Sequence, residues 1–151
     1  MSLCIFFGHG ECYGLDKGIL RTAIEELINQ GVNEFMVGNH GDYDSMVFSC
    51  LRELSKEFPG LSYSVILAYI PTHKPEYDLY EGHSVYPEGQ EIGPQKFAIS
   101  RRNQYLIDSG GVGDYCIVYV THTWGNAYKL ARKAKRKGFT VINIGNPNIE
   151  L

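Results

Sequence analysis

The fold of this chain is decided by residues 3–38, LCIFFGHGECYGLDKGILRTAIEELINQGVNEFMVG. Residues 3–8 are a short apolar run, which is typical of a buried β-strand. Residues 16–30 then carry apolar side chains at helical spacing, and Gly31 is placed to end that helix. Residues 34–38 form a second short apolar run. The stretch therefore predicts a strand, a helix and a second strand, as in proteins built on a parallel sheet.

The same alternation continues along the rest of the chain. The further predicted elements are a helix from Asp44 to Pro59-Gly60, strands at 63–70, 115–120 and 140–144, and helices at 94–109 and 126–137. Strands that are apolar throughout indicate a parallel sheet covered by helices on both faces. We therefore expect one α/β domain over residues 1–151, a Rossmann-like, doubly wound parallel sheet of about five strands in the order 3-2-1-4-5. Ligands of such sheets bind beyond the carboxyl ends of the strands, here between the first and the fourth strand.

The composition gives no sign of a membrane segment, a disulfide framework or a general attraction to nucleic acid. The chain has 151 residues, a net charge of −3 and four cysteines without CxxC spacing. No apolar run approaches the roughly 20 residues of a membrane span, and residues 1–4 lead straight into a strand, so we expect a soluble, cytoplasmic protein. A basic run over residues 129–137 is interpreted as the solvated face of a helix, because cations near a helix C-terminus are favoured.

Three glycine-rich turns follow strands of the predicted sheet, at residues 8–14, 38–44 and 121–126. All three fall at the same edge of a parallel sheet, where backbone N–H groups at helix N-termini can hold an anion. The alternative is purely conformational, since short turns between a strand and a helix need glycine in any case. The candidate ligand-binding residues in these turns are Gly8, His9, Gly10, Gly38, Gly41, Asp42, Asp44, Thr121, His122, Trp124, Gly125 and Asn126.

Arg102 and Asn103 are the candidate ligand-binding residues outside these turns. They flank the apolar stripe of the third predicted helix, so we expect both to reach the pocket and Arg101 to face solvent or a dimer partner. Arg102 either pairs with a carboxylate such as Asp108 or Asp44, or its guanidinium forms a fork with a ligand phosphate.

The connection over residues 71–93 is long for so small a domain, and its tyrosines favour a lid or an interface. The segment from Tyr77 to Tyr86 is more apolar than a solvated loop, so we expect a homo-oligomer, at least a dimer. Trp124 lies in a turn with little core to fill, which favours stacking on a base or capping the pocket. The alternative for Trp124 is packing beneath the connection.

His9, His40 and His122 each follow a different predicted strand. Three imidazoles at the same edge of the sheet would suit a zinc site or acid-base chemistry. We favour the simpler role of satisfying the turn backbones, and we expect neither a metal nor a cofactor. The sequence contains no HExxH, GxSxG, Walker-type GxxxxGK(S/T) or GxGxxG pattern, so the usual hydrolase, P-loop and dinucleotide-binding interpretations have no support.

A further set of motifs extends over nearly the whole chain, namely Phe7-Gly8-His9, Gly38, Gly41-Asp42, Val85-Tyr86-Pro87-Glu88-Gly89, Phe97-Ala98-Ile99-Ser100-Arg101-Arg102-Asn103, Asp114-Tyr115 and Thr121-His122-Thr123-Trp124-Gly125. On these residues the chain resembles the SLOG superfamily, the Rossmann-like group that links DprA-type proteins with LOG-type phosphoribohydrolases, and within it the YpsA-like branch. The resemblance implies a nucleotide-like ligand, held by backbone amides after the first and fourth strands and by Arg102. Relatives in this group include sensors of NAD-derived signals in bacterial immunity and hydrolases of nucleoside monophosphates.

The chain departs from the family pattern at three places. The LOG enzymes carry a PGGxGTxxE motif whose glutamate acts in cleavage, whereas residues 123–130 of this chain contain no glutamate. Asn126 stands where the branch usually has a second glycine, and Gly10 stands where the family often has an arginine.

These features favour a non-catalytic domain that senses or sequesters a nucleotide-derived molecule, such as an ADP-ribose-like compound, in a setting such as bacterial or phage immune signalling. The alternative is a nucleotide N-glycoside hydrolase in which Glu11 or Asp44 replaces the missing glutamate as acid, base or oxocarbenium stabiliser. A second alternative is a DprA-like binder of single-stranded nucleic acid that uses the basic run. The negative net charge disfavours it, so we expect no nucleic-acid partner.

Overall fold

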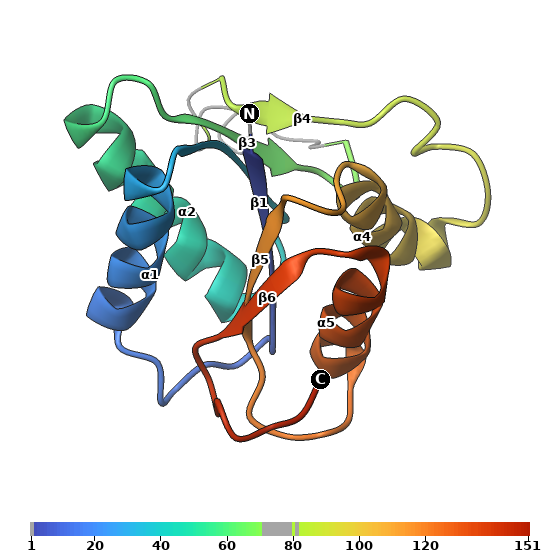
Figure 1. The fold of residues 1–151 in the computed structure, drawn as a ribbon. Helices are drawn as coiled ribbons and strands as arrows, with labels where there is room; N and C mark the ends of the chain where they lie inside the picture. The colour runs from blue at the N-terminus through green and yellow to red at the C-terminus, as the bar shows by residue number, and fades with distance from the viewer. Residues whose placement is uncertain (1, 71–79, 81) are drawn as a thin grey trace.

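The computed structural model describes residues 2–70, 80 and 82–151. Helices α1 and α2 cover one face of a parallel sheet, and α4 and α5 cover the other (Figure 1). The fold is therefore α/β, Rossmann-like and doubly wound, as the sequence predicts. The elements in chain order are β1 (Ser2–Gly8), α1 (Lys17–Asn29), β2 (Val32–Val37), α2 (Gly41–Glu57), β3 (Ser62–Ile66), β4 (Ser84–Val85), the 3₁₀ turn η1 (Gln95–Phe97), α4 (Ala98–Asp108), β5 (Tyr115–Tyr119), α5 (Asn126–Lys137) and β6 (Thr140–Asn143).

The sheet, within the described residues, has six parallel strands in the order β4-β3-β2-β1-β5-β6. From β1 the chain moves outward through β2 and β3, and it then crosses to the other side of β1 to add β5 and β6. The strand order therefore reverses between β1 and β5, where the predicted order 3-2-1-4-5 places the reversal. Ligands of open α/β sheets bind at such a point, so the carboxyl ends of β1 and β5 mark the place to search for a site.

The sequence predicts five strands, and β4 is the additional one. It lies inside the 71–93 connection, which we interpret from the sequence as a lid or an interface. Its two residues pair with the end of β3, and two residues are too few for periodicity to reveal a strand. Tyr80 and Tyr86 pack against the core, so these tyrosines belong to the body of the fold. Residues 71–79 and 81, which include Tyr77 of the same prediction, lie outside the described residues.

Two apolar layers hold the helices to the sheet. Beneath α1 and α2 the layer contains fully buried side chains such as Leu20, Phe35 and Leu51, and beneath α4 and α5 it contains Ile5 and Leu106. Burying one such side chain contributes about 1.5–3 kcal/mol. The four cysteines are free thiols buried within these layers. Among the described residues no helix has the length and apolar character needed to cross a membrane.

Candidate functional site

A cavity of about 200 Å³ lies at the reversal of strand order. The end of β1 forms one wall, the turn after β2 and the first turn of α2 form a second, and α4 with the start of α5 closes the other side. Segments that are far apart in the sequence therefore meet here, as the topology requires. The predicted ligand-binding residues that line this cavity are Gly8, Gly10, Gly38, Asp44, Arg102, Asn103 and Asn126.

Arg102 is the buried cation of the cavity, with 2% of its surface exposed. Its Nε donates to Oδ1 of Asn103 (2.9 Å), and its Nη1 donates to the Ile66 carbonyl (3.1 Å) and to Oδ1 of Asn39 (3.3 Å). Nη2 has no hydrogen-bond partner among the described residues. Burial lowers the pKa of Arg102, while the Asp44 charge acts in the opposite direction. The guanidinium is thus fixed in place with donor capacity left over.

Asp44 is the buried carboxylate of the same cavity. Its Oδ2 accepts a hydrogen bond from the backbone N–H of His40 at 3.0 Å. Burial raises the pKa of Asp44 to about 6, although the His40 N–H and the charge of Arg102 both act to lower it. A carboxyl group in this range changes its protonation state near neutral pH, so the charge of the cavity depends on pH.

The glycine turn before α2 leaves little room for an anion. The Gly10 carbonyl accepts a hydrogen bond from the N–H of Asp42 at 2.7 Å, and the first turn carries two acidic residues, Asp42 and Asp44. Gly41 has φ of +91°, and a Cβ there would lie 2.9 Å from the Gly10 Cα. Two segments of backbone therefore pack against each other here, and part of the glycine requirement is conformational, as the alternative interpretation holds.

The turn before α5 is open by comparison. Gly125 is the N-cap with φ of +92°, it makes no side-chain capping hydrogen bond, and the first turn of α5 carries no acidic residue. Asn126 and Ala127, which begin the helix, line the cavity. The unpaired N–H groups of a helix N-terminus carry partial positive charge and suit an anion.

Two other glycines make room for large side chains. A Cβ on Gly8 would lie 2.3 Å from ring atoms of Tyr43, and a Cβ on Gly38 would lie 2.4 Å from Nη1 of Arg102. Gly8 allows the buried Tyr43 ring to cross the end of β1, where its hydroxyl donates to the Ile117 carbonyl. Gly38 allows Arg102 to reach the sheet edge.

Three aromatic side chains form a column beside the cavity. His9 stacks on His122 with ring centroids 3.8 Å apart, and His122 stacks on Trp124 at 3.7 Å. The His9 Nε2 accepts a hydrogen bond from the Thr121 N–H, and burial, assisted by His122, lowers the pKa of His9. Trp124 is 68% exposed, so it does not pack beneath the described part of the 71–93 connection. Its flat ring ends the column and faces solvent.

His40 does not join this column. Its ring lies edge-on to Tyr69 with centroids 6.0 Å apart. No group of three metal-ligating side chains occurs within residues 2–70, 80 and 82–151. The structure therefore brings two of the three predicted histidines together and leaves the third at the far side of the cavity.

Arg101 is half-buried at the surface of α4. Its Nε donates to the Gln90 carbonyl at 3.0 Å and its Nη1 to the Pro94 carbonyl at 2.7 Å. The residue therefore fixes the segment before η1 against α4, a role that no sequence pattern reveals because its acceptors are backbone carbonyls. A contact of Arg101 with a dimer partner stays a prediction.

The remaining predicted residues lie outside the lining. Glu11, Asp42 and Thr121 are exposed at this edge of the sheet and do not line the cavity. Sequence reasoning missed the apolar lining from Ile99 and Leu106 of α4. Their helical spacing indicated a core face, and only the packing shows that this face also borders a cavity.

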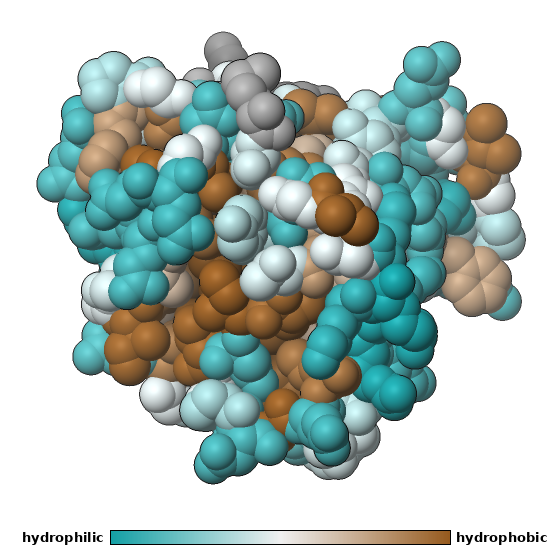
Figure 2. All heavy atoms as spheres, in the orientation of Figure 1, coloured by the Kyte–Doolittle hydropathy of each residue, from teal (hydrophilic) through white to brown (hydrophobic). Residues whose placement is uncertain are grey.

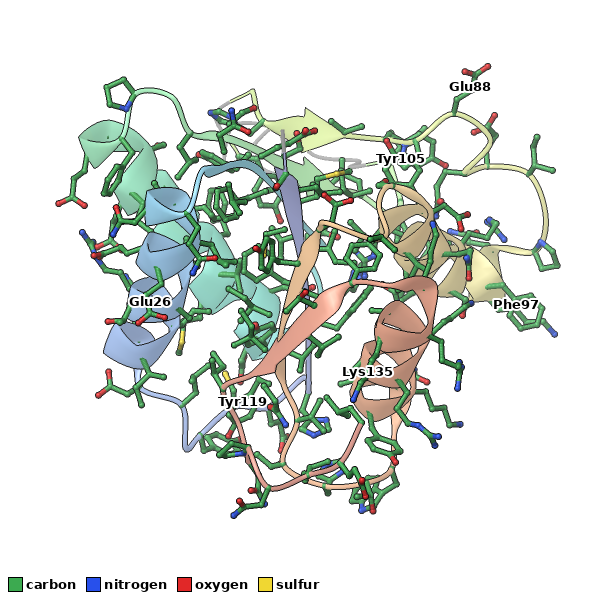
Figure 3. All side chains as sticks on the ribbon, in the orientation of Figure 1. Glu26, Glu88, Phe97, Tyr105, Tyr119 and Lys135 are labelled. Carbon is green, nitrogen blue, oxygen red and sulfur yellow. The ribbon has the colours of Figure 1, made fainter. Side chains whose placement is uncertain are left out.

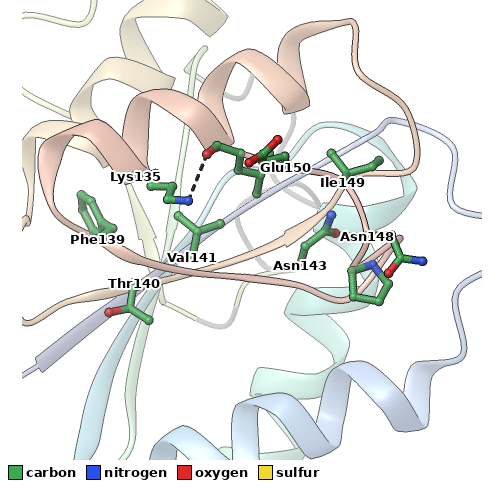
Figure 4. A pocket seen from close by; sticks show the side chains of 10 residues that line it. Lys135, Phe139, Thr140, Val141, Asn143, Asn148, Ile149 and Glu150 are labelled. Atoms are coloured by element: carbon green, nitrogen blue, oxygen red, sulfur yellow. Dashed lines mark hydrogen bonds between the residues drawn. The ribbon is translucent and has the colours of Figure 1, made fainter.

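A larger cavity of about 730 Å³ lies elsewhere, between the end of α5, β6 and residues 147–151 (Figure 4). Lys135 donates to the Leu151 carbonyl across it at 3.0 Å. The glycine turns and Arg102 do not contribute to its walls. The cavity at the strand reversal is smaller, yet it gathers a guanidinium, a carboxyl group and the N-terminus of a helix.

Comparisons with known proteins add no assignment to this geometry. No protein-family model matches the chain, and a search of curated proteins finds no significant match.

Proposed function

We propose that this chain binds a phosphorylated, nucleotide-derived small molecule at the strand reversal and senses or sequesters it without cleaving it. The observation that carries the proposal is the buried Arg102 guanidinium, whose Nη2 has no hydrogen-bond partner among the described residues and which lines the same cavity as the N-terminus of α5. Guanidinium groups match phosphate oxygens in geometry, and helix N-termini favour the same charge. The resemblance to SLOG domains supports the nucleotide part of the proposal.

The size of the cavity limits what it holds. Ligand pockets usually measure about 300–1,000 Å³, and the cavity at Arg102 measures about 200 Å³. It suits a phosphate or pyrophosphate group, while the rest of the ligand lies outside. The exposed ring of Trp124 next to it offers one stacking surface.

A binding panel tests the proposal. Isothermal titration with AMP, ADP, ADP-ribose and pyrophosphate should find at least one ligand that binds the wild-type chain. Arg102→Lys keeps the charge but loses the planar, fork-shaped pair of donors. It should therefore lower the affinity for that ligand by about tenfold. Arg136→Lys, on the exposed face of α5, is the matched control and should leave the affinity unchanged. A panel without any binder, or equal affinity in both variants, would refute the proposal.

A nucleotide N-glycoside hydrolase is the second candidate, and Asp44 is the observation that favours it. A general acid works best with a pKa near the operating pH, and burial raises the pKa of Asp44 to about 6 within the cavity. Glu11, the other candidate, is exposed outside the lining. Release of free base from AMP, measured by chromatography, should be lost in Asp44→Asn and kept in Glu11→Gln. No release by the wild-type chain eliminates this candidate.

The basic run on α5 does not favour a nucleic-acid partner. Lys137 donates to the Ile107 carbonyl and Lys135 to the Leu151 carbonyl, and Lys133 bonds to the Gln104 side chain. Several of these cations are therefore tied to the fold. The other exposed basic residues of α5 form a solvated helix face.

Self-association stays a proposal, and the described residues offer a second surface for it besides the segment from Tyr77 to Tyr86, part of which lies outside them. An apolar groove of about 530 Å³ runs between α1 and β6, lined by Ile19, Ile142 and Ile144. The apolar residues between these two elements are visible at the surface in Figure 2. Because β6 is an edge strand of the sheet, a second copy of the chain could cover both the groove and the edge. Sedimentation at micromolar concentration should show a dimer that Ile142→Lys dissociates, and a 17 kDa wild-type species would overturn the proposal.

A further inference from the structure

A second cavity, of about 420 Å³, lies between the end of β3 and the segment that leads into η1. It adjoins the cavity at Arg102. Tyr69 of the second cavity contacts His40 of the first, with ring centroids 6.0 Å apart, and Arg101 and Arg102 line the two cavities from consecutive positions of α4. Its volume is within the usual range of about 300–1,000 Å³ for small-molecule sites.

Gln90 gives this cavity a fixed hydrogen-bond acceptor. The residue is 3% exposed, and its Nε2 donates to the Ala68 carbonyl at 3.1 Å and to the Ala98 carbonyl at 2.6 Å. Both partners are acceptors, so the amide can sit in one orientation only and Oε1 must be the free end. Oε1 accepts no hydrogen bond from any described residue. An acceptor held in one orientation on the wall of a cavity is suited to receive a hydrogen bond from a ligand.

The wall that carries Gln90 is held in place before any ligand arrives. Arg101 donates to the Gln90 and Pro94 carbonyls, and Gln90 itself joins the end of β3 to the start of α4. These contacts tie the segment to two regular elements. A prearranged wall lowers the entropic cost of binding.

The chemistry of the lining favours a flat group that donates hydrogen bonds. Tyr69 and Tyr86 supply aromatic rings, and Glu91 supplies a carboxylate next to the Gln90 acceptor. Arg101 is the cation of the lining, and its Nε and Nη1 are engaged by backbone carbonyls. Rings suit stacking, and acceptors without competing donors suit an amino group.

We propose that this second cavity binds the base of the nucleotide, and that the base carries an exocyclic amino group that donates to Gln90 Oε1. The inference rests on the proposed function, because it assigns the base of the ligand whose phosphate lies at Arg102. Phosphate and base then occupy neighbouring cavities on either side of the His40 and Tyr69 contact. In this arrangement Trp124 stays outside the base site.

Adenosine and purine riboside, which differ by the amino group alone, test the donor directly. In ¹⁵N-labelled protein, adenosine should shift the Gln90 side-chain amide signal in a saturable way. Purine riboside should bind about tenfold more weakly, the effect of one lost hydrogen bond. Equal affinity for the two nucleosides would overturn the assignment of the amino group.

A pair of glutamates on one segment supplies the matched variants. Glu91 lines the cavity and Glu88 does not, and Figure 3 shows Glu88 pointing away from the body of the molecule. Both side chains are exposed, so either replacement should leave the fold intact. Glu91→Ala should lower the affinity for adenosine by about fivefold, and Glu88→Ala should leave that affinity unchanged. Equal effects of the two replacements would contradict the inference.

Pyrophosphate separates the failure of this inference from that of the proposed function. Inorganic pyrophosphate should shift the backbone amides of Asn126 and Ala127, which line the cavity at Arg102. If it does and adenosine leaves Gln90 unchanged, the base site is wrong and the phosphate site stands. If adenosine shifts Gln90 and pyrophosphate shifts nothing, the phosphate site is wrong, and the chain recognises a nucleoside instead.

Discussion

The N-termini of α2 and α5 border the same cavity, and they are built in opposite ways. At α2 the N–H of Asp42 already donates a hydrogen bond to the Gly10 carbonyl, and the acidic side chain of Asp44 lies within the first turn. At α5 the cap is Gly125, without a side-chain capping hydrogen bond or an acidic residue in the first turn. Residues 38–44 hold two glycines and residues 121–126 hold one, yet only the α5 turn is suited to an anion. The comparison shows that glycine content does not make an anion site unless the amides stay free and nearby charges permit it.

Arg102 lines the same cavity as these two helix ends. Of the replacements considered, its removal should cause the largest loss of stability. Arg102→Met keeps much of the side-chain volume but leaves the Asp44 charge buried without a cation and the Ile66 carbonyl without its donor. Breaking a buried charge arrangement on one side costs about 3–5 kcal/mol. Urea unfolding should show a loss of this size. Adding Asp44→Asn to Arg102→Met should restore part of the lost stability, because the buried negative charge is removed as well. If the double variant is as unstable as Arg102→Met alone, the charge of Arg102 does not offset that of Asp44.

Asp44 should make stability depend on pH at the α2 end. Its pKa is about 6 in the folded chain, against an ordinary value of 3.8, so the folded state binds the proton more tightly. This contribution to stability is complete below about pH 4 and is lost as the pH rises through 6, a change of about 3 kcal/mol. Urea unfolding of wild type and Asp44→Asn between pH 4 and 7 measures it. The two curves should diverge over this range, and parallel curves would contradict the buried state of Asp44.

Two glycines at the helix N-termini, Gly41 as the first residue of α2 and Gly125 as the N-cap of α5, compare the turns directly. Gly41 and Gly125 both have positive φ, but a Cβ on Gly41 meets the Gly10 backbone, whereas one on Gly125 lies 3.7 Å from His122 at the nearest. Gly125→Ala should cost about 1–3 kcal/mol from backbone strain alone, because φ of +92° with ψ of 173° is a conformation essentially restricted to glycine. Gly41→Ala should cost about 1–3 kcal/mol more than Gly125→Ala because steric overlap with the Gly10 backbone is added. Thermal unfolding that ranks the two variants in the opposite order would refute the close contact between Gly10 and Gly41.

Trp124, at the open α5 end, should matter least for stability. An exposed side chain away from the core changes the free energy of unfolding by about 0.5 kcal/mol at most. Trp124→Ala also separates two placements of the base: stacking on Trp124 predicts that the variant weakens nucleotide binding by about tenfold or more, whereas a base in the cavity at Gln90 predicts an unchanged affinity. Since Trp124 is the single tryptophan of the chain, its fluorescence reports the same event. Unchanged emission at saturating ligand would mean that Trp124 does not contact the ligand, and that Arg102 and the α5 N-terminus bind it without the tryptophan.

The sequence by itself determined the architecture, because local spacing of apolar residues carries that information. The run at 3–8, the helical pattern of 16–30 and their repeats predicted a parallel, doubly wound sheet and the edge at which its turns gather. From this the placement of Gly8, Gly38 and Asn126 around one cavity followed. Arg102 was also assigned to the cavity, since its position beside an apolar stripe indicates the buried side of the helix.

The tertiary structure alone decided which of these groups remain free to act, because that depends on contacts between distant segments. The pairing of β4 with β3, the Gly10 carbonyl at the α2 N-terminus and the stack of His9, His122 and Trp124 each join residues that no periodicity connects. Gln90 shows this most clearly. Nothing in its sequence neighbourhood marks it, and it becomes an oriented acceptor only when β3 and α4 place the Ala68 and Ala98 carbonyls on either side of its amide.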